Sequence, residues 1–304
     1  MTAHLSYVEA VVVGAFQGVT ELFPVSSLGH AVLVPALVGG QWGRDLNVST
    51  PESPYLAFIV GLHVATALAL LLYFRRDWVR IIGGFVSSVR NRRIQEADER
   101  LAWLLILATI PVGLTGLLLE HTFRTVLAKP MPTAAFLCAN GLLLLVVEQR
   151  RRVAGAEVAV HEVPLDEREV GEEVDRRLAS LSVKRAVLVG ATQIAALAPG
   201  ISRSGVAFAG GLRAGLDHEE AARFSFLLAT PVILAAGVLK IPDLTGPLGN
   251  GIRGQVILGS ALSGVGAYVS VALLVRWFRN RSARAFGVYC LVAGAISLVV
   301  LGLR

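Results

Sequence analysis

The chain has 304 residues, of which 54% are hydrophobic and 16% are charged, and its mean hydropathy is +0.65. Soluble domains carry nearer a quarter charged residues, so this composition excludes an ordinary soluble domain and indicates a membrane protein. The two cysteines lie far apart without CxxC spacing, which excludes a disulfide framework or a zinc ribbon. The net charge is +6, but the basic loops are interleaved with acidic residues and lack aromatic platforms for stacking bases, so we expect no nucleic-acid partner.

The N-terminal segment has no basic region before its first apolar run and carries Glu9, so we expect no cleaved signal peptide. A membrane-spanning helix needs roughly 20 apolar residues. Six windows approach or reach that length and predict six spans: residues 56–74, 101–119, 131–147, 222–239, 255–275 and 285–303. Arg223, at the start of the fourth window, is the one charged residue within them.

Lys and Arg concentrate in the segments 75–100, 149–185 and 276–284, whereas residues 40–55, 120–130 and 242–252 contain few of them. The positive-inside rule places the three basic segments on the cytoplasmic side.

Two further apolar segments, residues 5–39 and 186–217, are each broken by Pro, Gly and Ser. Shifting the sequence by 176 residues pairs Gly14 with Gly190 and Gln17 with Gln193, among six identities in an 18-residue window. Each broken segment precedes three predicted spans, and an odd number of crossings would invert the second copy. We therefore predict an all-α polytopic membrane protein, with six transmembrane helices and two re-entrant helical hairpins in an inverted-topology repeat.

The predicted organisation has three parts. Residues 1–148 form the first membrane repeat, 149–185 a charged cytoplasmic linker, and 186–304 the second membrane repeat. The linker should be helical or disordered, and we expect no chemistry in it. Irregular backbone at membrane depth is tolerated only inside protein or beside a wet cavity, so the two broken turns should meet within the bundle.

Polar and charged side chains gather at the two breaks, where the low dielectric makes a charge costly and therefore a functional candidate. Turns rich in backbone N–H groups, followed by helix N-termini, suit an anion. The candidates are Gln17, Glu21, Ser26, Ser27, His30, Gly200, Ser202, Arg203 and Ser204.

Each candidate has a predicted role. Arg203 offers a planar fork of donors for phosphate oxygens, and Glu21 with Gln17, at i and i+4, could hold Mg²⁺ or Ca²⁺. Ser27 is the predicted nucleophile and His30 its base, with direct attack by His30 or by metal-bound water as alternatives. Glu21 is also a predicted catalytic residue. Pyrophosphate binding is predicted for Ser26, Gly200, Ser202 and Ser204, although Ser26 could instead cap the following helix, and Ser202 and Ser204 could satisfy the backbone of their turn.

Two charged or titratable residues are expected outside the site. His63, within a predicted span, should be packed or hydrogen-bonded rather than a ligand. Arg223 could extend to the cytoplasmic interface or pair with charge behind the site, and we favour the interface.

The two broken segments resemble the bacitracin-resistance type of undecaprenyl-pyrophosphate phosphatase. The signature (E/Q)GxTExxPVSSxGH is met from Gln17 to His30, and PGxSRSG from Pro199 to Gly205. The runs FSFLLATP and LLYFRRDW also look like this family, so the resemblance covers most of the chain outside residues 149–185. Position 17 is Gln where some relatives carry a second Glu.

The resemblance implies a bacterial plasma-membrane enzyme, with its site facing the outer side and a divalent metal near the acidic motif. It implies hydrolysis of undecaprenyl pyrophosphate to undecaprenyl phosphate and inorganic phosphate. That reaction recycles the lipid carrier for peptidoglycan synthesis, so it supports cell-wall biogenesis and cell shape and confers bacitracin resistance.

Two alternative functions stay open. A polyprenyl-phosphate transporter or flippase would use the same anion-binding turns, although it needs no nucleophile. A lipid phosphatase of the phosphatidic-acid phosphatase superfamily would need a His and an Asp spaced differently from Asp217 and His218. The sequence is also compatible with a homodimer, and its expected partners are the polyprenyl pyrophosphate substrate and membrane lipids.

Overall fold

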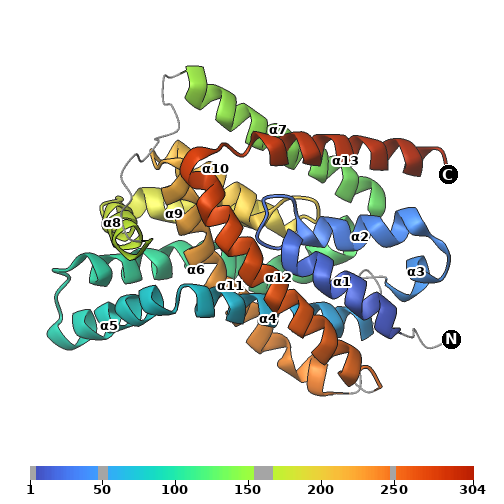
Figure 1. Cartoon of the computed structure of the whole chain (residues 1–304), viewed down its shortest axis with the longest axis horizontal. Helices are drawn as coiled ribbons and strands as arrows, with labels where there is room; N and C mark the ends of the chain where they lie inside the picture. The colour runs from blue at the N-terminus through green and yellow to red at the C-terminus, as the bar shows by residue number, and fades with distance from the viewer. Residues whose placement is uncertain (1–4, 47–53, 154–166, 247–250) are drawn as a thin grey trace.

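The computed structural model describes residues 5–46, 54–153, 167–246 and 251–304, and these ranges contain helices but no strand (Figure 1). This agrees with the predicted all-α class. The helices are α1 (Tyr7–Thr20), α2 (Ser27–Val38), α3 (Gly40–Asp45), α4 (Pro54–Tyr73), α5 (Arg75–Asn91), α6 (Ala97–Leu127), α7 (Pro130–Val153), α8 (Glu167–Ala179), α9 (Val183–Thr192), the 3₁₀ helix η1 (Gln193–Leu197), α10 (Arg203–Arg213), α11 (His218–Thr245), α12 (Arg253–Asn280) and α13 (Arg284–Gly302).

Within the described ranges, five helical segments are long and apolar enough to cross a membrane. A sixth candidate is the pair Phe58–Tyr73 and Arg75–Asn91, whose two helices meet at an angle of 84°. The structure thus confirms a polytopic membrane protein with five or six spans. The five segments are Ala97–Leu119, Pro130–Val153, His218–Leu239, Arg253–Asn280 and Arg284–Gly302.

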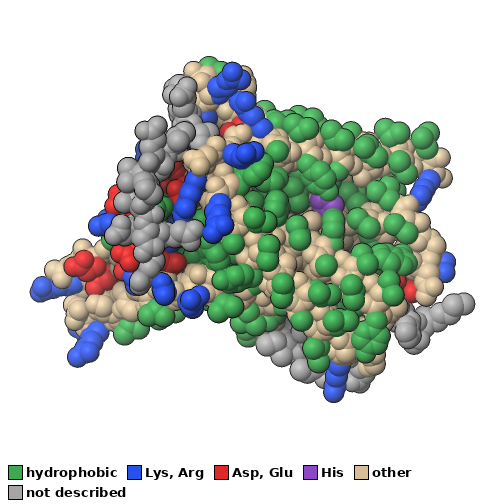
Figure 2. Space-filling view, viewed as in Figure 1, with side chains coloured by type: hydrophobic (Ala, Val, Ile, Leu, Met, Phe, Trp, Pro, Cys, Tyr) green, Lys and Arg blue, Asp and Glu red, His purple; other side chains and the backbone are tan. Residues whose placement is uncertain are grey.

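The surface matches this assignment. Hydrophobic side chains cover much of the face formed by α12, α13 and α1, whereas charged side chains gather at the end where α8 lies (Figure 2). On α13, Val288, Val292 and Val299 are exposed. An apolar face of this size would be costly in water and is expected against lipid tails.

The two broken segments form pairs of short helices. In the first, α1 begins with a capping box in which Ser6 and Glu9 satisfy each other's backbone N–H groups. The chain then leaves helical conformation after Glu21 and re-enters it at Ser27. In the second, η1 connects α9 to a turn that ends at Ser202, where α10 begins. Each turn therefore precedes a helix N-terminus.

Small residues let helices from opposite halves of the chain approach closely. A Cβ atom on Gly14 would lie 2.5 Å from the carbonyl oxygen of Gly259, so α1 packs directly on α12. A Cβ atom on Gly190 would lie 1.8 Å from the carbonyl oxygen of Ala108, so α9 packs directly on α6. The first helix of each broken pair is thereby held by a long helix from the other half.

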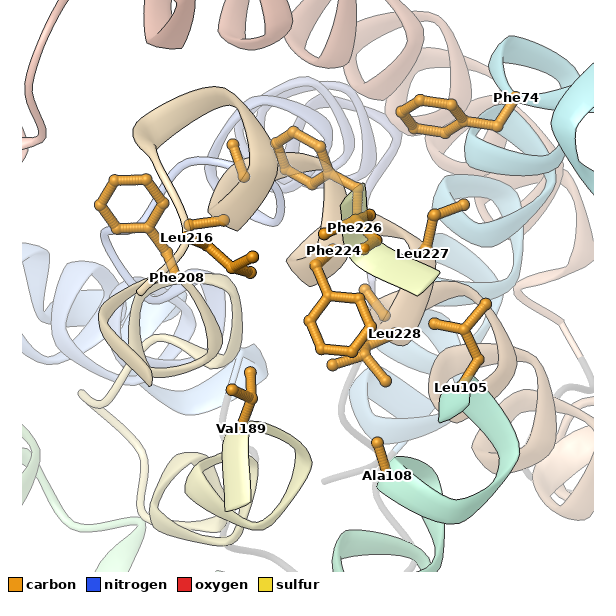
Figure 3. Close-up of a cluster of buried hydrophobic side chains, with 14 of the residues drawn as sticks. Phe74, Leu105, Ala108, Val189, Phe208, Leu216, Phe224, Phe226, Leu227 and Leu228 are labelled. Carbon is orange, nitrogen blue, oxygen red and sulfur yellow. The ribbon is translucent and has the colours of Figure 1, made fainter. Parts of the chain in front are cut away.

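The main hydrophobic core surrounds α11 (Figure 3). Phe224, Leu227 and Leu228 are completely buried there, with Leu105 of α6 and Phe208 of α10 in the same cluster. Because α10 belongs to the second broken pair, this core fixes that pair against the spans.

The described part of the predicted linker is helix α8, while residues 154–166 lie outside the described residues. Its Asp175 is buried and accepts hydrogen bonds from Arg223 Nε and Arg80 Nη2, both at 2.7 Å. Arg223 also pairs with Asp77 at 3.0 Å and lies over the Phe74 ring. The expected extension of Arg223 to the interface is therefore wrong, because two carboxylates compensate its charge inside the protein.

Candidate functional site

The two broken turns meet inside the helix bundle, as the sequence predicts. The hydroxyl oxygen of Ser26 accepts hydrogen bonds from the backbone N–H of Gly29 and of Gly200, both at 3.2 Å. Gly200 has a φ of +106°, and a Cβ atom on Gly29 would lie 2.9 Å from Gly200 Cα. Glycine at both positions is needed for this approach. Ser26 therefore caps α2 and joins the turns, which was one of the roles expected for it.

A buried amide from a neighbouring span holds both turns in place. Asn140 of α7 donates from Nδ2 to the carbonyl oxygen of Pro24 and accepts the backbone N–H of Ser202, both at 3.0 Å. Our sequence analysis missed this residue. The available signal was an Asn inside an otherwise apolar span, where an unpaired amide would be costly.

The carboxylate of Glu21 is the centre of the site. Its side chain is 3% exposed, and it directly follows α1. Its Oε1 accepts a hydrogen bond from Arg203 Nη2, and its Oε2 accepts one from the hydroxyl of Ser27. Three residues predicted for the chemistry, taken from both broken segments, are thus in direct contact. The Arg203 side chain is 22% exposed, so it can be reached from outside the protein.

Gln17, one helical turn earlier in the chain, contacts the Glu21 carboxylate. Its Nε2 donates to Glu21 Oε2 at 3.3 Å. Its Oε1 accepts hydrogen bonds from the hydroxyls of Thr66 and Ser263, which belong to α4 and α12. Both the nitrogen and the oxygen of this buried amide therefore have hydrogen-bond partners within the protein.

His30 lies near the junction, but its ring is turned toward other partners. Nδ1 lies 2.8 Å from the carbonyl oxygen of Ser26, which can only accept, so Nδ1 donates. In a neutral ring Nε2 then accepts from the Tyr289 hydroxyl, also at 2.8 Å, and the two rings are stacked. In this arrangement the hydroxyl of Ser27 faces Glu21. The role of His30 as base stays a prediction, and Tyr289 is a neighbour that the sequence did not reveal.

His63 belongs to the site, contrary to our expectation. Its Nε2 lies 3.2 Å from Glu21 Oε2. The prediction had His63 packed or hydrogen-bonded, and of these expectations the placement outside the site is wrong. Its spacing from Thr66, three residues later on the same apolar helix, was the signal that could have identified a polar face.

The second turn contributes an anion-binding environment. Ser202 caps α10 by accepting the Gly205 N–H at 3.1 Å, and its hydroxyl lies 3.1 Å from that of Ser204. The Ser204 hydroxyl lies 3.3 Å from the Phe23 carbonyl oxygen, so in this arrangement both serines serve the turns. The N-termini of α2 and α10 lie beside Glu21, where their dipoles and the charge of Arg203 favour an anion. Phosphate binding by these serines stays a prediction.

The donor atoms fit a divalent cation only in part. Within the described ranges, no group of three or more His, Cys, Asp or Glu residues could hold a metal ion. Glu21 supplies one carboxylate, whereas Gln17 turns its NH₂ group toward that carboxylate and its carbonyl oxygen away. Mg²⁺ commonly binds one or two carboxylates together with substrate phosphates. Glu21 fits such a shared site, and the carbonyl of Gln17 would have to turn to join it.

These features define a class: a polytopic membrane protein in which a carboxylate, a hydroxyl and a guanidinium meet between two broken helix pairs, in a site suited to a phosphorylated lipid. The sequence matches the family described as Bacitracin resistance protein BacA over residues 10–296. The chain belongs to this family.

Curated relatives cover the whole chain. A protein of Mycolicibacterium paratuberculosis named Undecaprenyl-diphosphatase is 65% identical over 100% of both chains. Undecaprenyl-diphosphatase 1 of Frankia casuarinae is 50% identical, over 98% of this chain and 99% of its own. Undecaprenyl-diphosphatase 2 of Chromobacterium violaceum is 43% identical, over 97% of this chain and 99% of its own.

Proposed function

We propose that this protein is a membrane hydrolase that converts undecaprenyl pyrophosphate to undecaprenyl phosphate and inorganic phosphate. The observation that carries the proposal is the contact of the Ser27 hydroxyl with the Glu21 carboxylate, beside Arg203. A transporter needs to coordinate the anion but has no use for a hydroxyl bonded to a base. The relatives named as undecaprenyl-diphosphatases support the same substrate. The reaction returns the lipid carrier to cell-wall synthesis, and by removing the pyrophosphate form it confers bacitracin resistance.

The site residues can be assigned to the steps of the reaction. Arg203 moves from Glu21 to the pyrophosphate, and the N-termini of α2 and α10 bind the same anion. Ser27 Oγ attacks the terminal phosphorus while Glu21 accepts its proton, and the bond to the bridging oxygen breaks. Glu21 then gives this proton to the departing oxygen of undecaprenyl phosphate, which regenerates the carboxylate as the lipid leaves. Water then attacks the phosphorylated serine, giving one proton back to Ser27 and releasing inorganic phosphate.

We further propose that Mg²⁺ or Ca²⁺ is held between Glu21 and the substrate phosphates. When bound, such an ion neutralises negative charge on the phosphate oxygens. Gln17 steadies the carboxylate through its Nε2 contact at 3.3 Å.

The proposed placement is in the bacterial plasma membrane, with two re-entrant hairpins in an inverted repeat and the site facing the outer side. The basic segments support this orientation because they would lie in the cytoplasm. The packing of α1 on α12 and of α9 on α6 supports the repeat, because the two halves make matching contacts. Glu21, Ser27 and Arg203 come from one chain, so a homodimer would contain two complete sites.

Phosphate release by the purified protein tests the proposal. In detergent, we expect undecaprenyl pyrophosphate to yield one phosphate per lipid, EDTA to stop the reaction, and Mg²⁺ or Ca²⁺ to restore it. A protein that remains monodisperse and releases no phosphate with any divalent cation would refute the hydrolase. Movement of a fluorescent polyprenyl phosphate across vesicles by that same protein would then establish the flippase.

A further inference from the structure

His63 connects α4 to the reactive carboxylate. Its Nε2 approaches Glu21 Oε2 at 3.2 Å, and its Nδ1 lies 2.8 Å from the Ile59 carbonyl oxygen one turn earlier on α4. A carbonyl and a carboxylate can only accept, so both ring nitrogens donate and His63 is an imidazolium here, with its ring plane fixed by Ile59 and its Nε2 directed at Glu21. The imidazole is 25% exposed, whereas the carboxylate is 3% exposed, so His63 is the more accessible partner of this pair.

This contact is one of two polar side-chain contacts, one helical turn apart, that connect α4 with the end of α1. Thr66 of α4 meets Gln17 of α1, and one turn away His63 meets Glu21. The order is reversed along the two chain segments, so α4 and α1 run antiparallel along this face. Buried polar side chains in an apolar bundle are costly unless each is paired. The second of these two contacts, from His63, ends on the proposed catalytic carboxylate of Glu21.

The proposed reaction requires the Glu21 carboxylate to be held by contacts other than that of Arg203. In the structure, Arg203 holds Oε1 of Glu21, while Ser27, Gln17 and His63 contact Oε2. Once Arg203 turns to the substrate phosphates, Oε1 loses this partner and is open to the proposed cation. The carboxylate would then be free to rotate away from the serine unless its other oxygen stayed anchored.

We propose that His63 is a positioning residue for the hydrolysis, donating a hydrogen bond from Nε2 that keeps Glu21 Oε2 against the Ser27 hydroxyl while Arg203 binds the pyrophosphate. This inference rests on the proposed function. It predicts an effect on turnover and not on substrate binding, because His63 acts through the carboxylate and not on the phosphates.

The test compares steady-state phosphate release by His63→Leu and His63→Gln. For His63→Leu we expect kcat to fall about 30-fold, with KM within about threefold of wild type, because a misplaced base loses geometry but not affinity. Gln keeps an N–H donor of similar reach, so His63→Gln should return to within about fivefold of wild type. Leu68→Ala, at an exposed position of the same helix, should match wild type.

A double-mutant cycle separates this role from a structural one. If His63 acts through Glu21, adding His63→Leu to a Glu21→Gln protein should change kcat by less than about twofold. His63→Asn, which is polar but too short to reach Oε2, replaces His63→Leu in the comparison if the latter unfolds. Wild-type kcat in both His63→Leu and His63→Asn, or an equal loss with Gln and with Leu, would overturn the inference. An inactive wild type would instead refute the hydrolase itself.

Discussion

Glu21→Gln is expected to lower kcat for phosphate release about 10³-fold, because the amide keeps the shape of the side chain but cannot accept the proton of Ser27. General-base catalysis contributes about 10²–10⁴-fold in enzymes. KM should stay equal or decrease. The carboxylate occupies Arg203 in the free enzyme, and the substitution releases this guanidinium for the pyrophosphate. Steady-state kinetics in detergent at saturating divalent cation measure the two constants separately.

The matched control for this substitution is Glu172→Gln, which makes the same chemical change on the exposed face of α8. It should retain wild-type kcat and KM. A Glu21→Gln protein with wild-type turnover would show that another group accepts the proton, and His30 would then be the first residue to examine.

Arg203→Ala is expected to reduce kcat/KM by 100-fold or more. Truncating one partner of a buried hydrogen-bonded charge pair costs about 2–5 kcal/mol, and about 1.4 kcal/mol corresponds to a tenfold change in rate. KM should rise, in contrast to Glu21→Gln, because Arg203 binds the phosphates directly. Arg203→Lys should recover only part of the loss, since an ammonium keeps the charge but not the planar fork.

Arg213→Ala provides the comparison, because Arg213 is exposed at the other end of α10. Its kinetics should be those of wild type. Thermal unfolding of the two alanine variants shows whether the loss of the Arg203–Glu21 pair also affects stability. A folded Arg203→Ala protein with an unchanged KM would exclude Arg203 from substrate binding.

The sequence predicted the meeting of the two turns because their residues are constrained locally. Pro24 and Pro199 interrupt apolar segments, and broken backbone at membrane depth must be enclosed by protein. Polar residues at the breaks then have to face one another. The contacts of Glu21 with Ser27 and Arg203 follow from that requirement.

The residues that the sequence did not assign are those whose partners lie far away along the chain. Asn140, His63 and Tyr289 each sit singly in a span, and helical pattern cannot specify which neighbouring helix will cover them. Arg223 was misjudged for a related reason. Its partner Asp175 lies in the linker, whose docking onto the core has no signature in the apolar pattern.

The orientation of the Gln17 amide could not be predicted from the sequence either. The i and i+4 spacing correctly placed Gln17 beside Glu21, but spacing does not specify which end of an amide faces a carboxylate. Hydroxyls from Thr66 and Ser263 meet its carbonyl oxygen. Donors from two other spans therefore decide the orientation, and these spans are distant in the sequence.

Rapid-quench analysis of a single turnover tests the central claim most directly, using undecaprenyl pyrophosphate labelled in its terminal phosphate. The label should appear on Ser27 before it appears as free phosphate, with mass spectrometry locating the phosphorylated residue, and Ser27→Ala should form no adduct and release no phosphate. Release of free phosphate at the wild-type rate by Ser27→Ala, with no labelled protein at any time, would contradict the account.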